Sequence, residues 1–272
     1  MRSPAAAAQL SSPECAPPRG VDRPWIVGRV TAPSPRLRLL CLPQAGGSAS
    51  SYAPWRLTPP PGIELATVEL PGRGVRSAES LPDTLEELAD AVIDGISDEF
   101  DMPYALFGHS FGALLGYEIA VRIGRRGLTP PRALLASAAR APHTPVRKRI
   151  ADRDDEGLLD WLYGFGGFPP ELRNYPAYLR YALGAVRRDL ALIERYQATA
   201  PVPVDCPLYA FGGGDDPLVS EAQLERWRDC AAAGFRLQLL PGGHDYLFTG
   251  ATAALDAVAA ALTDPIPGSC EG

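Results

Sequence analysis

The stretch from Pro103 to Ile123 constrains the fold more than any other part of this 272-residue chain. It holds an apolar run, then the pentapeptide GHSFG at 108–112, then a run of helix-forming residues. This order predicts a strand that turns sharply into a helix and lifts the hydroxyl of Ser110 clear of the backbone. The glycines at both ends suit a strained turn and a helix that passes close to neighbouring strands. The pentapeptide also occurs by chance, so its meaning depends on the rest of the chain.

Segments of strand character alternate with segments of helical character along most of the sequence. Short apolar runs predict strands over 36–42, 63–70, 104–107, 133–137, 208–211 and 236–240. Apolar residues at helical spacing predict helices over 84–100, 113–126, 178–197, 220–233 and 246–262. This alternation indicates the α/β class, with a mostly parallel central sheet flanked by helices on both faces.

The pattern also divides the chain. Residues 1–35 are rich in Ala, Pro, Ser and Arg and are expected to form a mostly disordered leader, with an extended piece at Trp25–Val30 as an alternative for its end. Residues 36–262 form one domain. From about 142 to 203 the alternation stops, which predicts a helical lid inserted over an active site. Residues 263–272 are expected to form a loose tail.

Polar residues follow several of the predicted strands, and ligands bind beyond the carboxyl ends of the strands in such sheets. Ser110, an acid and His244 follow three strands in the chain order of α/β-hydrolases. A serine hydroxyl needs a base to take its proton, His244 can be that base, and a carboxylate would fix the histidine tautomer. Asp216, directly before Pro217, is favoured as the acid, with Asp215 as the alternative.

Two backbone N–H groups are candidates for an oxyanion hole, which stabilises negative charge on the reacting oxygen. They belong to Ala45, in the glycine-rich loop after the first strand, and to Phe111, directly after the serine. The glycines of that loop could also form only a tight turn. His109 is expected to pack or hydrogen-bond locally, and His143 to be an exposed loop histidine.

The predicted lid carries an aromatic group and a basic group. The aromatic side chains could form the core of the lid or line a hydrophobic acyl channel; they are Trp161, Tyr163, Phe165 and Phe168. The basic side chains are expected to form a solvated face, with docking of an acidic partner as the alternative; they are Arg147, Lys148, Arg149 and Arg153.

Composition excludes several classes of protein. A net charge of -6 argues against a general nucleic-acid binder. No apolar run approaches the ~20 residues needed to cross a bilayer, and the amino terminus lacks the apolar region of a secretion signal. The five cysteines are scattered and contain no C-x-x-C pair, which argues against a zinc site or a disulfide framework. We therefore expect a soluble cytoplasmic protein without a metal.

Several collinear motifs resemble those of the type II thioesterases, the stand-alone editing partners of polyketide and nonribosomal peptide synthases. The resemblance covers about residues 36–262. It rests on LPQAGGSASSYAPW (42–55), ELPGRGVRSAE (69–79), GHSFGA (108–113), SAARAP (137–142), RDLALIERYQ (188–197), GGGDDPLVS (212–220) and LLPGGHDYL (239–247).

The resemblance implies an α/β-hydrolase core with a helical lid. It implies hydrolysis of acyl groups from the phosphopantetheine arm of an acyl or peptidyl carrier protein, with no cofactor beyond that arm of the substrate. Carried over by position, its site residues are the nucleophile Ser110, the acid Asp216, the base His244 and the oxyanion donors Ala45 and Phe111.

One position departs from the family pattern. Gln44 stands where these enzymes commonly have histidine, which affects local polarity and substrate preference. Two other functions remain open from the residues alone. One is a carboxylester hydrolase that uses the same three side chains on small esters. The other is a noncatalytic protein of this fold that only binds an acyl ligand.

Overall fold

The computed structural model describes residues 24–146, 148–168, 170–196, 198, 200–264 and 266. In this part of the chain a seven-stranded sheet has the order β1-β3-β2-β4-β5-β6-β7. Its strands are β1 (Ile26–Val30), β2 (Leu37–Leu42), β3 (Ile63–Val68), β4 (Tyr104–His109), β5 (Leu134–Ser137), β6 (Leu208–Gly213) and β7 (Phe235–Leu240). β1 pairs antiparallel with β3, and every other neighbouring pair is parallel. The predicted mostly parallel sheet is therefore confirmed.

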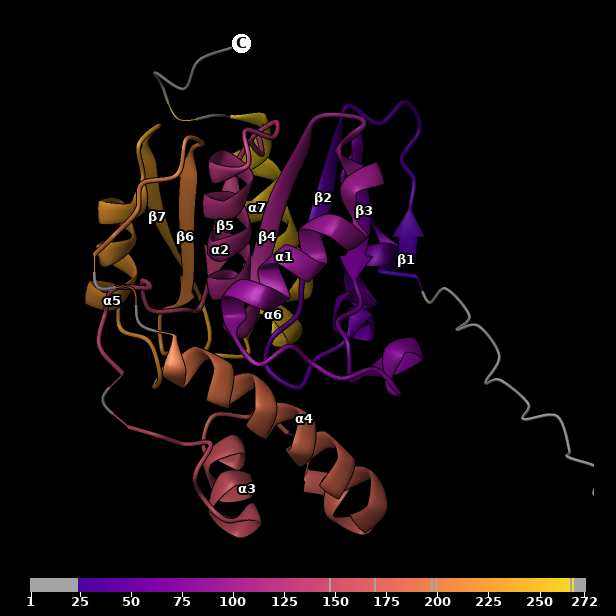
Figure 1. Ribbon diagram of the computed structural model, residues 1–272, viewed down its shortest axis with the longest axis vertical. Helices are drawn as coiled ribbons and strands as arrows, with labels where there is room; N and C mark the ends of the chain where they lie inside the picture. Colours follow the sequence, from indigo (N-terminus) through magenta and orange to yellow (C-terminus); the bar gives the residue numbers. More distant parts are fainter. Residues whose placement is uncertain are drawn as a thin grey trace, which may run out of the picture.

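Helices cover both faces of this sheet (Figure 1). They are α1 (Leu85–Gly95), α2 (Phe111–Arg125), α3 (Asp155–Tyr163), α4 (Pro176–Arg195), α5 (Glu221–Glu225), α6 (Tyr246–Thr249) and α7 (Ala251–Thr263). α1 and α2 lie in front of the sheet in the figure and α7 lies behind it. Successive strand residues point to opposite faces of the sheet and belong to two apolar cores. Leu106 lies in the core between the sheet and α1 and α2, and Phe107 lies in the core between the sheet and α7. The strand period of two thus explains the two-sided core.

The first strand lies in the extended piece expected at Trp25–Val30 of the predicted leader, and it pairs with the sheet, which therefore begins before residue 36. In β1, Val27 pairs with Thr67 of β3. Just before it, the guanidinium of Arg76 lies 3.4 Å from the ring centroid of Trp25. A strand this short is held by its partner strand and by such contacts. The amino-acid composition of the segment does not predict these tertiary contacts. The rest of the predicted leader, residues 1–23, and most of the predicted tail lie outside the described residues.

Three predicted helices are shorter or broken. The helix expected over 84–100 consists of α1 followed by a 3₁₀ turn, Ser97–Phe100. The helix expected over 220–233 consists of α5 followed by a 3₁₀ turn, Arg226–Cys230. The helix expected over 246–262 is divided into α6 and α7 at Gly250. In the segment 220–233 the buried Trp227 indole donates a 2.8 Å hydrogen bond to the carbonyl of Ala139, a tertiary contact that a helical pattern cannot express.

The helical insertion expected between β5 and β6 is present as α3 and α4. The two helices lie together at one end of the sheet (Figure 1). They share a small apolar cluster of their own, which includes Leu158, Leu162, Leu183 and Leu190. Val186 of α4 lies so close to the loop after β2 that a Cβ at Gly46 would be 2.3 Å from its methyl carbon. The insertion is therefore packed on the loop expected to supply an oxyanion donor.

Candidate active site

Ser110 joins β4 to α2 in a strained turn. Its φ of 54° and ψ of −112° lie in a region that residues with a side chain rarely adopt. Its backbone N–H donates a 2.7 Å hydrogen bond to the carbonyl of Ser137 in β5. A Cβ at Gly108 would lie 2.0 Å from the carbonyl oxygen of Gly112, and one at Gly112 would lie 2.3 Å from that of Leu42. Only glycine fits these two places, which explains the predicted turn.

The hydroxyl of Ser110 lies in a hydrogen-bonded row with His244 and Asp216. His244 Nε2 is 3.2 Å from Ser110 Oγ, and its Nδ1 is 2.8 Å from Asp216 Oδ2. The other oxygen of Asp216 accepts from the backbone N–H groups of Leu218 at 2.7 Å and Val219 at 3.1 Å. The Asp216 side chain is fully buried. The carboxylate of Asp216 is therefore fixed in one orientation toward the imidazole of His244.

The choice between the two adjacent aspartates is resolved by this geometry. Asp215 is exposed, and its backbone N–H donates to the carbonyl of Gly242 at 2.9 Å. Its side chain makes no contact with His244 among the described residues. Asp216 is the carboxylate that lies within hydrogen-bonding distance of His244 Nδ1.

The two candidate oxyanion donors lie at one edge of the sheet. β2 and β4 are neighbours in which Leu42 pairs with Gly108, and Ala45 and Phe111 each follow the paired residue by three positions. Among the residues that the structure describes, no acceptor is recorded for either backbone N–H. Phe111 is also the first residue of α2, where helical N–H groups have no partner within the helix. Both groups are therefore available to an anionic oxygen.

A second serine–histidine contact lies beneath the first. His109 Nδ1 is 2.8 Å from Ser137 Oγ, which is 2.5 Å from the hydroxyl of Tyr246. Burial, and secondly the nearby His244, hold the pKa of His109 well below its usual value. Ser137 is wholly inaccessible, and no carboxylate of the described chain contacts His109. The local role predicted for His109 is confirmed, and substrate reaches Ser110 more readily than Ser137.

One of the four lid aromatics reaches the histidine. The ring of Phe165 stands edge-on to that of His244, with centroids 5.3 Å apart, and packs against Trp161 at 4.8 Å. Tyr163 lies beneath the guanidinium of Arg173, and Phe168 packs against the apolar cluster of the lid. The aromatic group therefore serves in large part as lid core, with Phe165 at its boundary with the site.

Gln44 lies at the base of the glycine-rich loop. Its side-chain oxygen is buried and has no hydrogen-bond partner within the described part of the chain. A Cβ at Gly47 would lie 2.7 Å from that amide group. The amide thus fills space against Gly47 inside the loop.

The prediction that His143 is exposed is wrong. Only 6% of its side chain is accessible, and its Nε2 lies 3.1 Å from a carboxylate oxygen of Asp229. The ring also approaches the thiol of Cys230 at 3.8 Å. Prolines on both sides of a loop favour exposure, but here the turn after α5 packs against the ring of His143.

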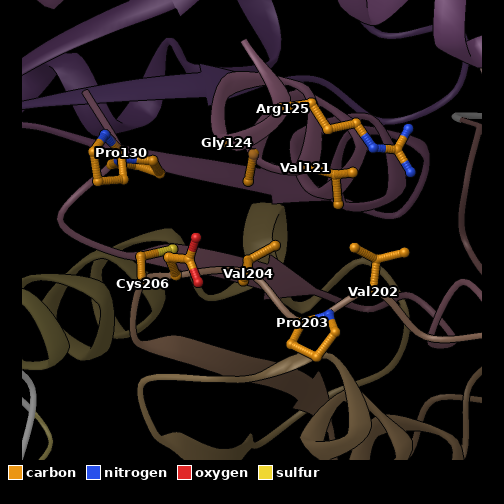
Figure 2. Close-up of a pocket in the computed structure, with 11 residues that line it drawn as sticks. Val121, Gly124, Arg125, Pro130, Val202, Pro203, Val204 and Cys206 are labelled. Carbon is orange, nitrogen blue, oxygen red and sulfur yellow. The ribbon is translucent and has the colours of Figure 1, made fainter. Parts of the chain in front are cut away.

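A surface pocket of about 230 Å³ lies away from these residues (Figure 2). Val121, Gly124 and Arg125 line it from the last turns of α2, opposite Pro203 and Cys206. Because α2 begins beside Ser110 and is 15 residues long, about 22 Å separates its two ends. This pocket is therefore separate from the candidate active site.

No group of three or more His, Cys, Asp or Glu side chains among the described residues is arranged to hold a metal ion. No helix in this part of the chain is long and apolar enough to span a bilayer.

The fold and the strained serine turn define the class as α/β-hydrolase. A thioesterase-domain family model matches residues 37–264. A probable cadicidin biosynthesis thioesterase of Streptomyces griseus is 36% identical over 86% of this chain and 63% of its own length. The gramicidin S biosynthesis protein GrsT of Aneurinibacillus migulanus is 32% identical over 82% of this chain and 88% of its own length.

A solved structure agrees with these sequence matches. The type II thioesterase BorB from the borrelidin biosynthetic cluster is 33% identical, with a TM-score of 0.78 over 88% of this chain and 97% of that one. The chain belongs to the thioesterase family, as a serine thioesterase of the type II kind found in nonribosomal peptide and polyketide pathways.

Proposed function

We propose that this protein hydrolyses acyl thioesters on the phosphopantetheine arm of an acyl or peptidyl carrier protein, with Ser110 carrying the acyl group between two half-reactions. The single observation that supports it best is the row Ser110–His244–Asp216, with distances of 3.2 Å and 2.8 Å. The substrate class is inferred from relatives in gramicidin S and borrelidin biosynthesis. The enzyme would release stalled or aberrant chains from the carrier.

In the first half-reaction, Ser110 Oγ attacks the thioester carbonyl carbon while His244 Nε2 takes its proton. The carbonyl oxygen becomes an oxyanion facing the N–H groups of Ala45 and Phe111. One such donor contributes about 3–4 kcal/mol to transition-state stability in other serine hydrolases. His244 then gives the proton to the sulfur of the phosphopantetheine arm as the carbon–sulfur bond breaks. The free thiol leaves with the carrier protein.

In the second half-reaction, water attacks the acyl-Ser110 ester. His244 takes a proton from the water and returns it to Ser110 Oγ, which frees a carboxylic acid. Asp216 Oδ2 accepts a hydrogen bond from the Nδ1–H of His244, so that Nε2 faces the serine unprotonated before each step. Its charge then stabilises the imidazolium without becoming protonated.

We also propose that the exposed basic residues at the start of the lid meet the acidic carrier protein. Lys148, Arg149 and Arg153 are exposed, and Arg147 lies outside the described residues. Arg149 has one long contact, 3.9 Å to Asp152, and such exposed pairs contribute at most about 1 kcal/mol. Arg153 donates one hydrogen bond, 3.3 Å long, to the carbonyl of Gly157. These contacts are exposed, so the side chains can also bind an acidic surface. If charge reversal at Lys148 and Arg149 leaves KM for the acylated carrier unchanged at low salt, this docking face is wrong.

The proposed compartment is the cytoplasm. Cys41, Cys206 and Cys230 are free buried thiols, which suits a reducing environment.

The experiment compares hydrolysis of an acyl-loaded carrier protein with hydrolysis of esters that have the same acyl group. We expect the thioester on the carrier to be the better substrate by kcat/KM, and Ser110→Ala to reduce turnover at least about 10³-fold. Ester turnover far above carrier turnover would favour the ester-hydrolase alternative. Acyl binding without turnover by the unmodified protein would favour the noncatalytic alternative.

A further inference from the structure

A buried ion pair joins the lid helix to the glycine-rich loop. Asp189, in the middle of α4, is 0% accessible at its side chain, and its partner Arg73 is 4% accessible. The two oxygens of Asp189 accept from the two terminal nitrogens of Arg73, each at 2.6 Å. Asp189 Oδ2 also accepts from the backbone N–H of Gly46 at 2.8 Å, and Arg73 Nη1 donates to the carbonyl of Gly47 at 3.0 Å. Three segments far apart in the sequence meet at this pair.

The contacted peptide groups directly follow Ala45, a proposed oxyanion donor. Gly46 has a φ of 71°, and the N–H of Gly47 donates to the carbonyl of Gln44 at 2.8 Å to close the turn. Two adjacent glycines give a backbone many accessible conformations. A fixed direction for the Ala45 N–H therefore needs restraint from outside the loop, and Asp189 and Arg73 supply it on one N–H and one carbonyl.

Stability alone is a poor explanation of such a pair. Taking both charges out of water is costly, and apolar residues of similar volume often replace a buried ion pair without loss of stability. What apolar residues cannot do is accept from the Gly46 N–H or donate to the Gly47 carbonyl. The pair is therefore better explained by the loop geometry that it imposes.

We propose that Asp189 and Arg73 are positioning residues for the oxyanion hole, acting through the backbone of Gly46 and Gly47. The lid helix α4 is then a fixed part of the reaction site as well as its cover. This inference rests on the proposed function, because it assigns a purpose to the loop only if Ala45 receives the developing negative charge.

The main variant replaces the pair by apolar residues, Arg73→Met with Asp189→Leu. Its matched control is Asp155→Asn, which breaks an exposed ion pair with Arg187 in the same lid. We expect the double variant to keep the melting temperature of the unmodified protein within a few degrees. We expect its kcat on an acyl-pantetheine thioester to fall about 10- to 100-fold with KM changed less than about threefold. The control should keep both values.

A second readout separates positioning from general distortion. A trifluoromethyl ketone analogue of the acyl group forms a tetrahedral oxyanion on Ser110, whereas the corresponding alcohol does not. The ketone should bind the double variant more weakly by about the factor lost in kcat/KM, while the alcohol binds as before. If kcat is unchanged, or if both ligands weaken together, the positioning role is wrong.

Asp189→Asn provides the same test if the double variant does not fold. It keeps an acceptor for Gly46 but loses the charge that holds Arg73, and a kcat decrease of about tenfold is expected. An unchanged kcat in this variant overturns the inference. The Ser110→Ala protein is measured alongside, because turnover that survives it would overturn the proposed function itself rather than the role of Asp189.

Discussion

Ser110 holds a backbone conformation that its surroundings must enforce. A side chain at a φ of 54° costs about 1–3 kcal/mol. The hydrogen bond from its N–H to the carbonyl of Ser137 opposes that cost, as does the close contact between Gly108 and Gly112. The strain places the hydroxyl at the end of β4, within reach of His244.

His109 supports the same arrangement from below. Its ring lies 5.4 Å from the ring of His244 and hydrogen-bonds to the backbone of that residue as well as to Ser137. Because burial holds the pKa of His109 well below its usual value, the ring stays neutral in the folded protein. A neutral ring avoids a second positive charge beside the imidazolium that forms during the reaction.

The neutrality of His109 predicts a pH-dependent contribution to stability. Below its unfolded-state pKa of about 6.5, the unfolded chain binds a proton at this position that the folded chain does not bind, so acid favours unfolding. Between pH 7 and pH 5 this one group should lower the free energy of unfolding by up to about 2 kcal/mol, the limit for a ring that stays neutral in the folded protein over that whole range. His109→Gln should remove that part of the pH dependence. Urea unfolding at both pH values measures it, and parallel losses in the two proteins would contradict the prediction.

At the scale of elements, α2 packs unusually close to β2. A Cβ at Gly112 would meet the backbone at the end of β2, 2.3 Å from the carbonyl oxygen of Leu42 and 2.7 Å from that of Pro43. These are backbone atoms at the carboxyl end of an inner strand and cannot move aside as a side chain can. The distance between α2 and the sheet depends on this contact. The position of Ser110 at the start of α2 therefore depends on it too.

Gly112→Ala should therefore destabilise the protein by roughly 3 kcal/mol or more, through overpacking against backbone. Gly124→Ala, near the other end of the same helix, is the matched control. Its Cβ would meet nothing closer than 3.9 Å, so the better helix propensity of alanine should leave stability equal or raise it by up to about 1 kcal/mol. Thermal and urea unfolding compare the two. Equal stability of both variants would contradict the prediction, because it would mean that α2 and β2 can move apart to accommodate the added Cβ.

The elements were predictable where the sequence pattern is local. The apolar runs that predicted β2, β4 and β6 are buried strands. β1 was assigned mainly to a leader, because its stability comes from pairing with β3 rather than from its own sequence. The break between α6 and α7 lies at Gly250. It was not predicted, because the helical spacing of apolar residues continues on both sides of this single glycine.

At the scale of the whole molecule, the site is assembled from loops that follow four different strands. Ala45 follows β2, Ser110 follows β4, Asp216 follows β6 and His244 follows β7. The rule that ligands bind beyond the carboxyl ends of parallel strands brings these residues together from sequence alone. The same rule says nothing about residues on helices that close over this edge.

Asp189 shows that limit most clearly. In the sequence it lies in a helical run beside other charged residues, where a charge is usually solvent-exposed. Its partner Arg73 is 116 positions away, and only the packing of α4 on the sheet edge brings them together. Ser137 and Tyr246 were missed for a similar reason, because their 2.5 Å contact joins β5 to α6 across 109 positions.

The central claim is that the acyl group passes through Ser110, and it can be tested by trapping that intermediate. The protein is mixed with an acyl-loaded carrier protein, quenched in acid within milliseconds, digested with trypsin and analysed by mass spectrometry. Cleavage after Arg122 and Arg132 places Ser110 and Ser137 in different peptides. We predict the acyl mass on Ser110, and none on the corresponding peptide of Ser110→Ala. An acyl group on Ser137, or rapid turnover with no acyl group on Ser110, would contradict the account.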